Sequence, residues 1–210
     1  MWKYYIIGMV VGYLFGCFQT AYIIGRMHHI DIREHGSGNA GTTNALRTLG
    51  KKAAILTFLG DALKGLIPVL LAKYLVQKSG LSIDASLLAL VTGLFVVLGH
   101  NFPFYLKFRG GKGIATTAAV LLAFDLRFAA ISFVLFMTVV LITRYVSLSS
   151  IVMVCGIPIE ILVFYRESSP WLLVVGYIFT GLAIIRHHGN IHRLLNGTES
   201  KLGEKKKEKV

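Results

Sequence analysis

The sequence predicts an all-α fold: a polytopic transmembrane bundle of about seven helical spans, with the N-terminus outside and the C-terminus in the cytoplasm. Of the 210 residues, 55% are hydrophobic and only 15% are charged, which is too apolar for an ordinary soluble domain. The apolar residues form long blocks, and the basic residues gather in alternate connections between them. We therefore expect one membrane domain, residues 1–200, and a basic cytoplasmic tail, residues 201–210.

Six apolar blocks follow one another along the chain. A helix needs roughly 20 residues to cross the hydrocarbon core, and all but the last of these blocks come close to that length or exceed it. The blocks are Tyr4–Gly25, Ala53–Val76, Leu81–Gly99, Ile114–Ile142, Val146–Tyr165 and Trp171–Ile185. In the first block, Gly8, Gly12 and Gly16 recur every four residues, which predicts a face for close helix packing in lipid.

The block Ile114–Ile142 is too long for one span. Its 29 residues would extend about 43 Å as a single helix, and Asp125 and Arg127 lie at its middle. We expect two short helices that turn at Asp125-Leu126-Arg127, which brings the total to seven.

The placement of basic residues predicts the orientation. With the N-terminus outside, the inner segments hold 16 of the 22 lysines and arginines, the outer segments hold 5, and Lys64 lies within a helix. This asymmetry follows the positive-inside rule. It also supports the turn at Asp125, because a single span there would place the basic tail outside.

The net charge of +12 indicates contact with anionic membrane lipid, at about 1 kcal/mol for each cation near the surface. Nucleic acid is not an expected partner, because the chain has no soluble domain to bind it. All seven histidines and the Gly-Asn clusters lie in the inner segments. A carrier or channel would place its polar groups near the middle of the membrane, so this asymmetry favours an enzyme at the cytoplasmic surface.

The first polar segment is REHGSGNAGTTNALRTLG, residues 33–50. Its Ser37, Gly38, Asn39 and Gly41 can form a turn whose backbone N–H groups point into a concavity, with Asn44 at the start of a helix. Arg47 would add a fork of donors for phosphate or another oxyanion. The alternative is an ordinary capped loop between helices, where the same residue types are common.

The second segment is GHNFPFYLKFRGGKGIAT, residues 99–116. Its glycines Gly110, Gly111 and Gly113 allow close approach of the backbone, and Lys112 can reach an anion at the start of the next helix. A P-loop needs Gly-x-x-x-x-Gly-Lys-Ser/Thr, and Leu106 stands where its first glycine should be, so we expect no nucleotide. A flexible basic loop against lipid headgroups is the alternative.

The third segment is RHHGNIHRLLNGTESK, residues 186–201. Its His187 and Asn190 share one helix face, and the histidine could be a general base, a phosphate ligand or an interfacial residue. Familiar metal-ligand spacings are missing and the inner face is cationic, so we expect neither a metal nor a cofactor.

Two further polar features accompany these segments. Asp61 and Lys64 lie one turn apart within a span, where they are either functional or a structural ion pair. The segment RYVSLSS, residues 144–150, offers the hydroxyls of Ser147, Ser149 and Ser150 for a phosphate, and of these we favour Ser150; the alternative is an ordinary helix cap.

Taken together, SGNAGTTNALRTLG, GHNFPFYLKFRGGKGIAT and HHGNIHRLLNGTESK, in this order between apolar spans, resemble the bacterial acyl-phosphate:glycerol-3-phosphate acyltransferases. The resemblance implies a multi-pass enzyme of the bacterial cytoplasmic membrane that transfers a fatty acyl group from acyl phosphate to the 1-hydroxyl of glycerol 3-phosphate. The products would be lysophosphatidic acid and phosphate, at the first step of phospholipid synthesis.

The resemblance also implies roles for residues of each motif. It assigns Ser37 and Arg47, the Gly110–Gly113 loop, and His187 with Asn190 to the active site, whereas Glu199 would be structural. Both substrates carry phosphate, so positioning and charge neutralisation can supply much of the catalysis without metal or nucleotide. The rival hypothesis is a membrane carrier or channel for an organic phosphate.

Overall fold

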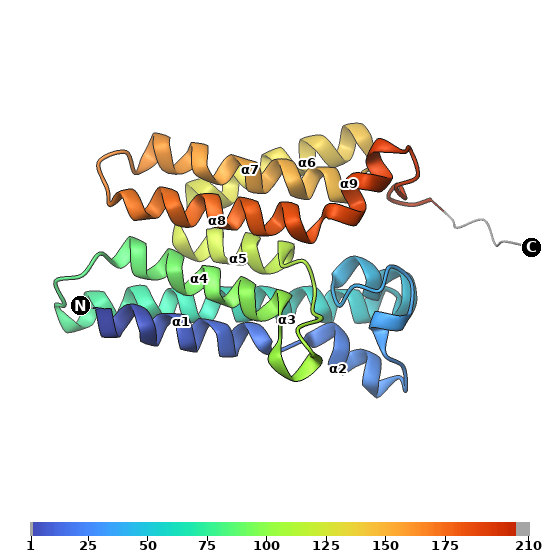
Figure 1. Ribbon diagram of the computed structural model, residues 1–210, viewed down its shortest axis with the longest axis horizontal. Helices are drawn as coiled ribbons and strands as arrows, with labels where there is room; N and C mark the ends of the chain where they lie inside the picture. The colour runs from blue at the N-terminus through green and yellow to red at the C-terminus, as the bar shows by residue number, and fades with distance from the viewer. Residues whose placement is uncertain (1, 205–210) are drawn as a thin grey trace, which may run out of the picture.

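The structure is a computed structural model that describes residues 2–204, and every regular element in that range is a helix (Figure 1). Two single-turn helices, η1 and η2, interrupt the longer ones. In chain order the elements are α1 (Trp2–Cys17), α2 (Thr20–Met27), η1 (Ile32–Glu34), α3 (Thr42–Ser79), α4 (Ala85–Asn101), η2 (Phe104–Leu106), α5 (Ile114–Phe124), α6 (Leu126–Thr143), α7 (Val146–Phe164), α8 (Pro170–Arg186) and α9 (His188–Leu195).

The expected spans are helical, which confirms an all-α membrane bundle, although the first expected span is divided between α1 and α2 and the helices differ in length. Within residues 2–204, five segments are long and apolar enough to cross a membrane, and a sixth qualifies if α8 and α9, bent by 61°, count as one. Helix α5 has only 11 residues, about 16 Å, roughly half the hydrocarbon thickness. The bundle therefore has one short helix among its expected seven, and the exact number of full crossings stays a prediction.

The expected break in the long apolar block is confirmed. Helix α5 ends at Phe124 and α6 begins at Leu126, with Asp125 between them in an extended conformation. The Asp125 carboxylate accepts the N–H of Arg127 at 2.9 Å and forms an ion pair with its guanidinium at 2.6 Å. This local N-cap starts α6 and turns the chain back.

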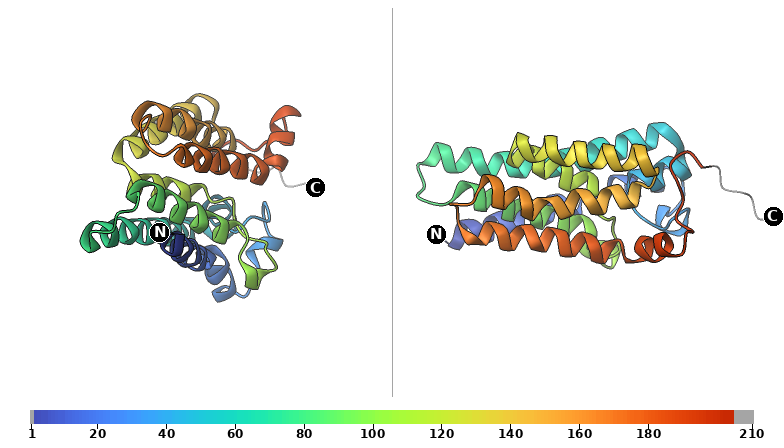
Figure 2. Two further views of the ribbon diagram at one scale, coloured as in Figure 1. Left: turned by 60° about the vertical axis from the view of Figure 1, so that its left-hand side comes forward. Right: turned by 90° about the horizontal axis from the view of Figure 1, so that it is seen from above.

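The glycine face of α1 packs directly on α4. A methyl group at Gly12 would lie 2.4 Å from the Thr92 carbonyl oxygen, and one at Gly16 would lie 2.0 Å from that of Val96. Only glycine permits this approach, which confirms the expected role of the small residues. The two helices form one layer with α3, and α6, α7 and α8 lie on the other side of α4 and α5 (Figures 1 and 2).

Helix α3 is interrupted near its start. Gly50 has φ 84° and ψ −174°, so the short helix Thr42–Leu49 is separated from the membrane-spanning part that follows. Glycine alone adopts this conformation readily. The break is therefore a kink between two helical segments of α3.

Candidate active site

The three polar segments of the sequence meet at one end of the bundle. This end, which we call the polar end, comprises residues 28–41, 102–113 and 187–204; α1 begins at the opposite end (Figure 1). Residues far apart in the chain are thus brought together by the length and alternation of the helices.

The first segment forms a loop held from within by Asn44. The Asn44 amide nitrogen donates to the carbonyl oxygens of Ile32 and His35, both at 3.0 Å, and its oxygen accepts the N–H of Ser37 at 2.8 Å. Asn44 is 1% exposed, and its amide group is fully engaged. In this arrangement it organises the loop, while the side chains of Ser37, Asn39 and Arg47 are left to line the cavity described below.

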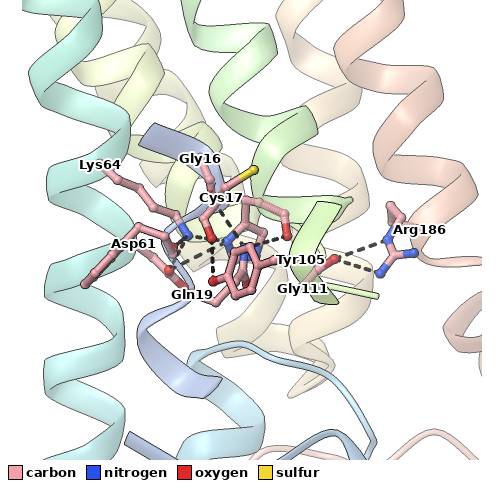
Figure 3. Close-up of polar contacts among 10 residues, drawn as sticks. Gly16, Cys17, Gln19, Asp61, Lys64, Tyr105, Gly111 and Arg186 are labelled. Atoms are coloured by element: carbon pink, nitrogen blue, oxygen red, sulfur yellow. Dashed lines mark hydrogen bonds and ion pairs between the residues drawn. The ribbon is translucent and has the colours of Figure 1, made fainter. Parts of the chain in front are cut away.

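The second segment is clamped on both sides of its glycines. The N–H groups of Gly110 and Gly111 donate to the carbonyl oxygens of Asn101 and His100, each at 3.1 Å. The Arg186 guanidinium donates to the Gly111 carbonyl oxygen from Nε at 3.1 Å and from Nη2 at 2.8 Å (Figure 3). Its Nη2 atom also donates to the Gly110 carbonyl oxygen at 3.1 Å. These two N–H groups are therefore already used inside the protein, and the side chain of Lys112 is the part of the loop that reaches the cavity.

The third segment is organised around Glu199. Its Oε1 atom accepts hydrogen bonds from Ser147 at 2.7 Å and from Asn190 at 2.6 Å, and its Oε2 atom pairs with Arg193 at 2.6 Å. The Asn190 side-chain oxygen in turn accepts a hydrogen bond from the Lys112 ammonium at 2.5 Å. One carboxylate thus connects α7 with α9. Through Asn190 it also connects them with the Gly110–Gly113 loop, which we call the glycine loop.

Lys112 and His187 are electrostatically unusual. Burial, the largest influence, lowers the pKa of Lys112 to about 8; Glu199 raises it, and Arg193, Arg186 and Arg47 lower it further. His187 lies just beyond the last residue of α8. Burial lowers its pKa to about 4, although a hydrogen bond from Nδ1 to the Ala183 carbonyl oxygen, 2.8 Å, favours the protonated form. Lys112 is therefore a cation and His187 neutral at pH 7.

Glu199 is held ionised by its neighbours. Burial raises its pKa, but the hydrogen bonds from Ser147, Asn190 and Arg193 outweigh burial, so the pKa of Glu199 lies below its ordinary value. The carboxylate charge partly balances Lys112 and Arg193 in the same region.

A cavity of about 1490 Å³ opens at the polar end and is lined by residues of all three segments. Among residues predicted for the site or its support, its wall contains Ser37, Asn39, Gly41, Asn44, Arg47, Asp61, Lys112, Gly113, Ser150, His187, Asn190 and Glu199. Gly38, Gly110, Gly111 and Lys64 are not part of that wall. Gly38 and Gly110 instead line a small neighbouring pocket with Arg33, Arg109 and Arg186.

Three helix N-termini open into this cavity. Thr42 and Thr43 begin α3, Ile114 and Ala115 begin α5, and Val146 begins α7; all five line the wall. Unpaired N–H groups and the helix dipole make such ends favourable for anions. Lys112, Arg47 and Arg193 line the same cavity and add positive charge to it.

The cavity continues as an apolar groove between α3, α5 and α6. Its wall there consists of small and apolar side chains, among them Ala118, Ala119, Leu122, Ala129, Ala130 and Phe133. Leu122 and Phe133 are 49% and 65% exposed on the side of the bundle. The groove therefore opens sideways, toward the hydrocarbon that surrounds a membrane protein.

Of the candidate hydroxyls in residues 144–150, those of Ser147 and Ser150 lie at the wall, and the favoured Ser150 donates to its own helix at the Val146 carbonyl oxygen, 2.8 Å. His100 and Glu204 also line it. The sequence did not single out these two residues: the His100 ring contacts Lys64, 36 positions away, whereas Glu204 accepts the backbone N–H of Lys201. Residues 201–204 fold back on Arg144, whose backbone carbonyl accepts the Leu202 N–H at 2.7 Å; the rest of the expected tail lies outside the described residues.

The fold is that of an integral membrane protein, with a cation-lined cavity at one end and an apolar groove on the side of the bundle. The family model described as glycerol-3-phosphate acyltransferase matches residues 6–197. The glycerol-3-phosphate acyltransferase of Clostridioides difficile (strain 630) is 45% identical over 96% of this chain and 97% of its own length. That of Thermoanaerobacter sp. (strain X514) is 44% identical, over 96% and 98%.

Two crystal structures of PlsY, an integral membrane glycerol 3-phosphate acyltransferase, share the fold. Its glycerol 3-phosphate form matches with a TM-score of 0.83 and 36% identity, over 95% of this chain and 96% of that one. Its lysophosphatidic acid form matches with a TM-score of 0.80, over 95% of each chain. The chain belongs to the glycerol-3-phosphate acyltransferase family, of the PlsY type.

Proposed function

We propose that the protein transfers the acyl group of a fatty acyl phosphate to the 1-hydroxyl of glycerol 3-phosphate, releasing lysophosphatidic acid and inorganic phosphate. The observation that carries the proposal is the two-part cavity. Its polar part joins three helix N-termini with Lys112, Arg47 and Arg193, and its apolar groove leads away between α3, α5 and α6. Two phosphate-bearing substrates, one with a long chain, match this combination.

The groups at the polar end suggest a direct transfer. The hydroxyl oxygen of glycerol 3-phosphate attacks the acyl carbonyl carbon, and the bond from that carbon to the bridging phosphate oxygen breaks. Lys112, Arg47 and the helix N-termini hold the phosphate charges and the charge that develops on the carbonyl oxygen. Ser37, which lines the same wall, would contribute a hydroxyl to one of the substrates.

The proton of the attacking hydroxyl goes to a phosphate group in this mechanism. With a pKa of about 4, His187 is a weak base. A phosphate monoester has a second pKa of about 6 and accepts a proton more readily. Because the Nδ1 atom of His187 faces a backbone carbonyl oxygen, its Nε2 atom carries the free lone pair and can orient the hydroxyl by accepting its hydrogen bond.

The donor is tested with the purified full chain in detergent. Phosphate release is followed with acyl phosphate and glycerol 3-phosphate, each alone and both together, and then with an acyl thioester as the donor. Release that needs both substrates, and no transfer from the thioester, supports the proposal. Transport of glycerol 3-phosphate into vesicles without turnover would instead favour a carrier.

We further propose that the polar end faces the cytoplasm of a bacterial cell, as its many cations suggest. Ser200→Cys at the polar end and Ser168→Cys at the opposite end are placed in a background with Cys17 and Cys155 replaced by alanine. A membrane-impermeant thiol reagent applied to intact cells should label position 168 only. Labelling of position 200 alone would reverse the orientation.

A further inference from the structure

Beneath the glycine loop, two helices bury three ionisable side chains against one another. Asp61 and Lys64 of α3 and His100 of α4 are 2%, 4% and 2% exposed. The Lys64 ammonium lies 2.8 Å from Asp61 Oδ1, 2.7 Å from His100 Nδ1 and 2.6 Å from the Phe18 carbonyl oxygen (Figure 3). We call these three residues the buried triad.

The buried triad is costly for stability alone. Removing an ammonium and a carboxylate from water carries a penalty of several kcal/mol for each ion, and well-packed apolar residues often do as well or better. An ion pair between Asp61 and Lys64 was one of the two alternatives that the sequence left open, whereas the contact of Lys64 with His100, 36 residues away, was not predicted. That contact connects the triad with the second polar segment.

His100 contacts the glycine loop in two ways, through its backbone carbonyl oxygen and through its ring. Its carbonyl oxygen accepts the Gly111 N–H at 3.1 Å and the Gln19 side-chain amide at 3.0 Å. Its ring lies directly against the loop, because a methyl group at Gly111 would be 2.0 Å from His100 Nε2. On the other face, Arg186 holds the carbonyl oxygens of Gly110 and Gly111.

The protonation pattern of His100 argues against a role as a base. The Lys64 ammonium has only donors to offer, so His100 Nδ1 accepts from it and the ring proton resides on Nε2. Neither ring nitrogen then has a lone pair for a substrate proton, although His100 and Asp61 reach the cavity wall. The ring is instead fixed from below by Lys64 and supports Gly111 above.

We infer that the buried triad is a positioning device for the glycine loop, and that His100 is a positioning residue that acts on substrate through Lys112. The loop residue that follows Gly111 is Lys112, whose ammonium contacts Asn190 in the cavity. A shift of the imidazole would therefore move the cation that binds phosphate. Misplacement by about 1 Å costs on the order of a hundredfold in rate in well-organised sites.

The test removes the triad without leaving a buried charge alone. The double variant Asp61→Asn/Lys64→Met eliminates carboxylate and ammonium together. His100→Leu removes the ring, and His100→Asn keeps a polar atom near the Nδ1 position. Lys73→Met is the matched control: it lies on the same helix and donates to the Ala123 and Phe124 carbonyl oxygens at 3.1 and 2.8 Å, away from the loop.

We expect the double variant and His100→Leu to raise the KM for glycerol 3-phosphate at least about tenfold, with a smaller change in kcat. The pH at which kcat/KM falls on the alkaline side should also rise from about 8, because the pKa of Lys112 rises when the loop relaxes and the ammonium is better hydrated. The charged groups that act on Lys112, namely Glu199, Arg193, Arg186 and Arg47, are unchanged in every variant. His100→Asn should recover most of the loss, and Lys73→Met should match the wild type.

Helix content and the unfolding temperature in detergent identify any variant that fails to fold. If the other variants do not fold, His100→Asn, the mildest change, still tests the inference, because it should show the same changes in KM and pH profile to a smaller degree. A folded double variant with wild-type KM and pH profile would overturn the inference, as would equal effects of Lys73→Met. The inference rests on the proposed function only because the kinetic assay measures that reaction. If the wild type has no acyl-phosphate-dependent turnover, that function fails, and calorimetric binding of glycerol 3-phosphate to the same variants still tests the positioning role.

Discussion

Lys112 should determine the high-pH limb of the reaction. Its pKa of about 8 means that about 90% of the side chain is charged at pH 7 and about 9% at pH 9. A neutral amine does not hold a phosphate dianion, so kcat/KM for glycerol 3-phosphate should fall about tenfold between these two values. The variant Lys112→Arg keeps its charge throughout, since arginine titrates above about 12.

The assay compares the shapes of pH profiles, because arginine does not reproduce the geometry of lysine and absolute rates will fall. The kcat/KM of Lys112→Arg, relative to its own value at pH 7, should stay nearly constant to pH 9. The low-pH limb, which belongs to the substrate phosphate with its second pKa of about 6, should be the same in both proteins. Lys107→Met, an exposed change in the same loop, is the control and should keep the wild-type limb. An unchanged limb in Lys112→Arg would refute the assignment to Lys112.

Three further changes test other parts of the site. Gly111→Ala should lower kcat/KM by roughly a hundredfold, since its methyl group would lie 2.0 Å from His100 Nε2; Gly181→Ala, with nothing within 4 Å, should retain activity. Ala130→Phe, in the apolar groove, should raise the KM for a long-chain acyl phosphate more than for an eight-carbon one, and equal effects would argue against the groove as the chain site. Glu199→Gln removes a charge that accepts three hydrogen bonds, so the unfolding temperature in detergent should fall by several degrees together with kcat.

The bundle was predictable because its signals are local. The length of the apolar block and the pair Asp125 and Arg127 located the turn between α5 and α6, which a capping carboxylate then forms. The repeat of small residues likewise indicated the packing face of α1. Each of these features is encoded within one continuous stretch of the chain.

The parts that the sequence did not predict depend on distant residues. Backbone amides in a glycine-rich loop look available for an anion, but those of Gly110 and Gly111 pair with carbonyl oxygens at the end of α4. Likewise, nothing in the spacing of Asp61 and Lys64 identified His100 as their third partner. The alanine-rich faces of α5 and α6 read simply as apolar helix, and their value as a groove emerges only when α3 packs beside them.

The sideways opening of the apolar groove has a consequence for how the enzyme encounters its substrate. A donor whose chain is dissolved in the bilayer can enter along the membrane plane, and its acylated product can leave by the same route without passing through water. The quantity that sets saturation is then the mole fraction of donor among the surrounding lipids. Adding inert detergent at constant total donor should slow the reaction by dilution within the surface, whereas the response to glycerol 3-phosphate should follow its ordinary bulk concentration.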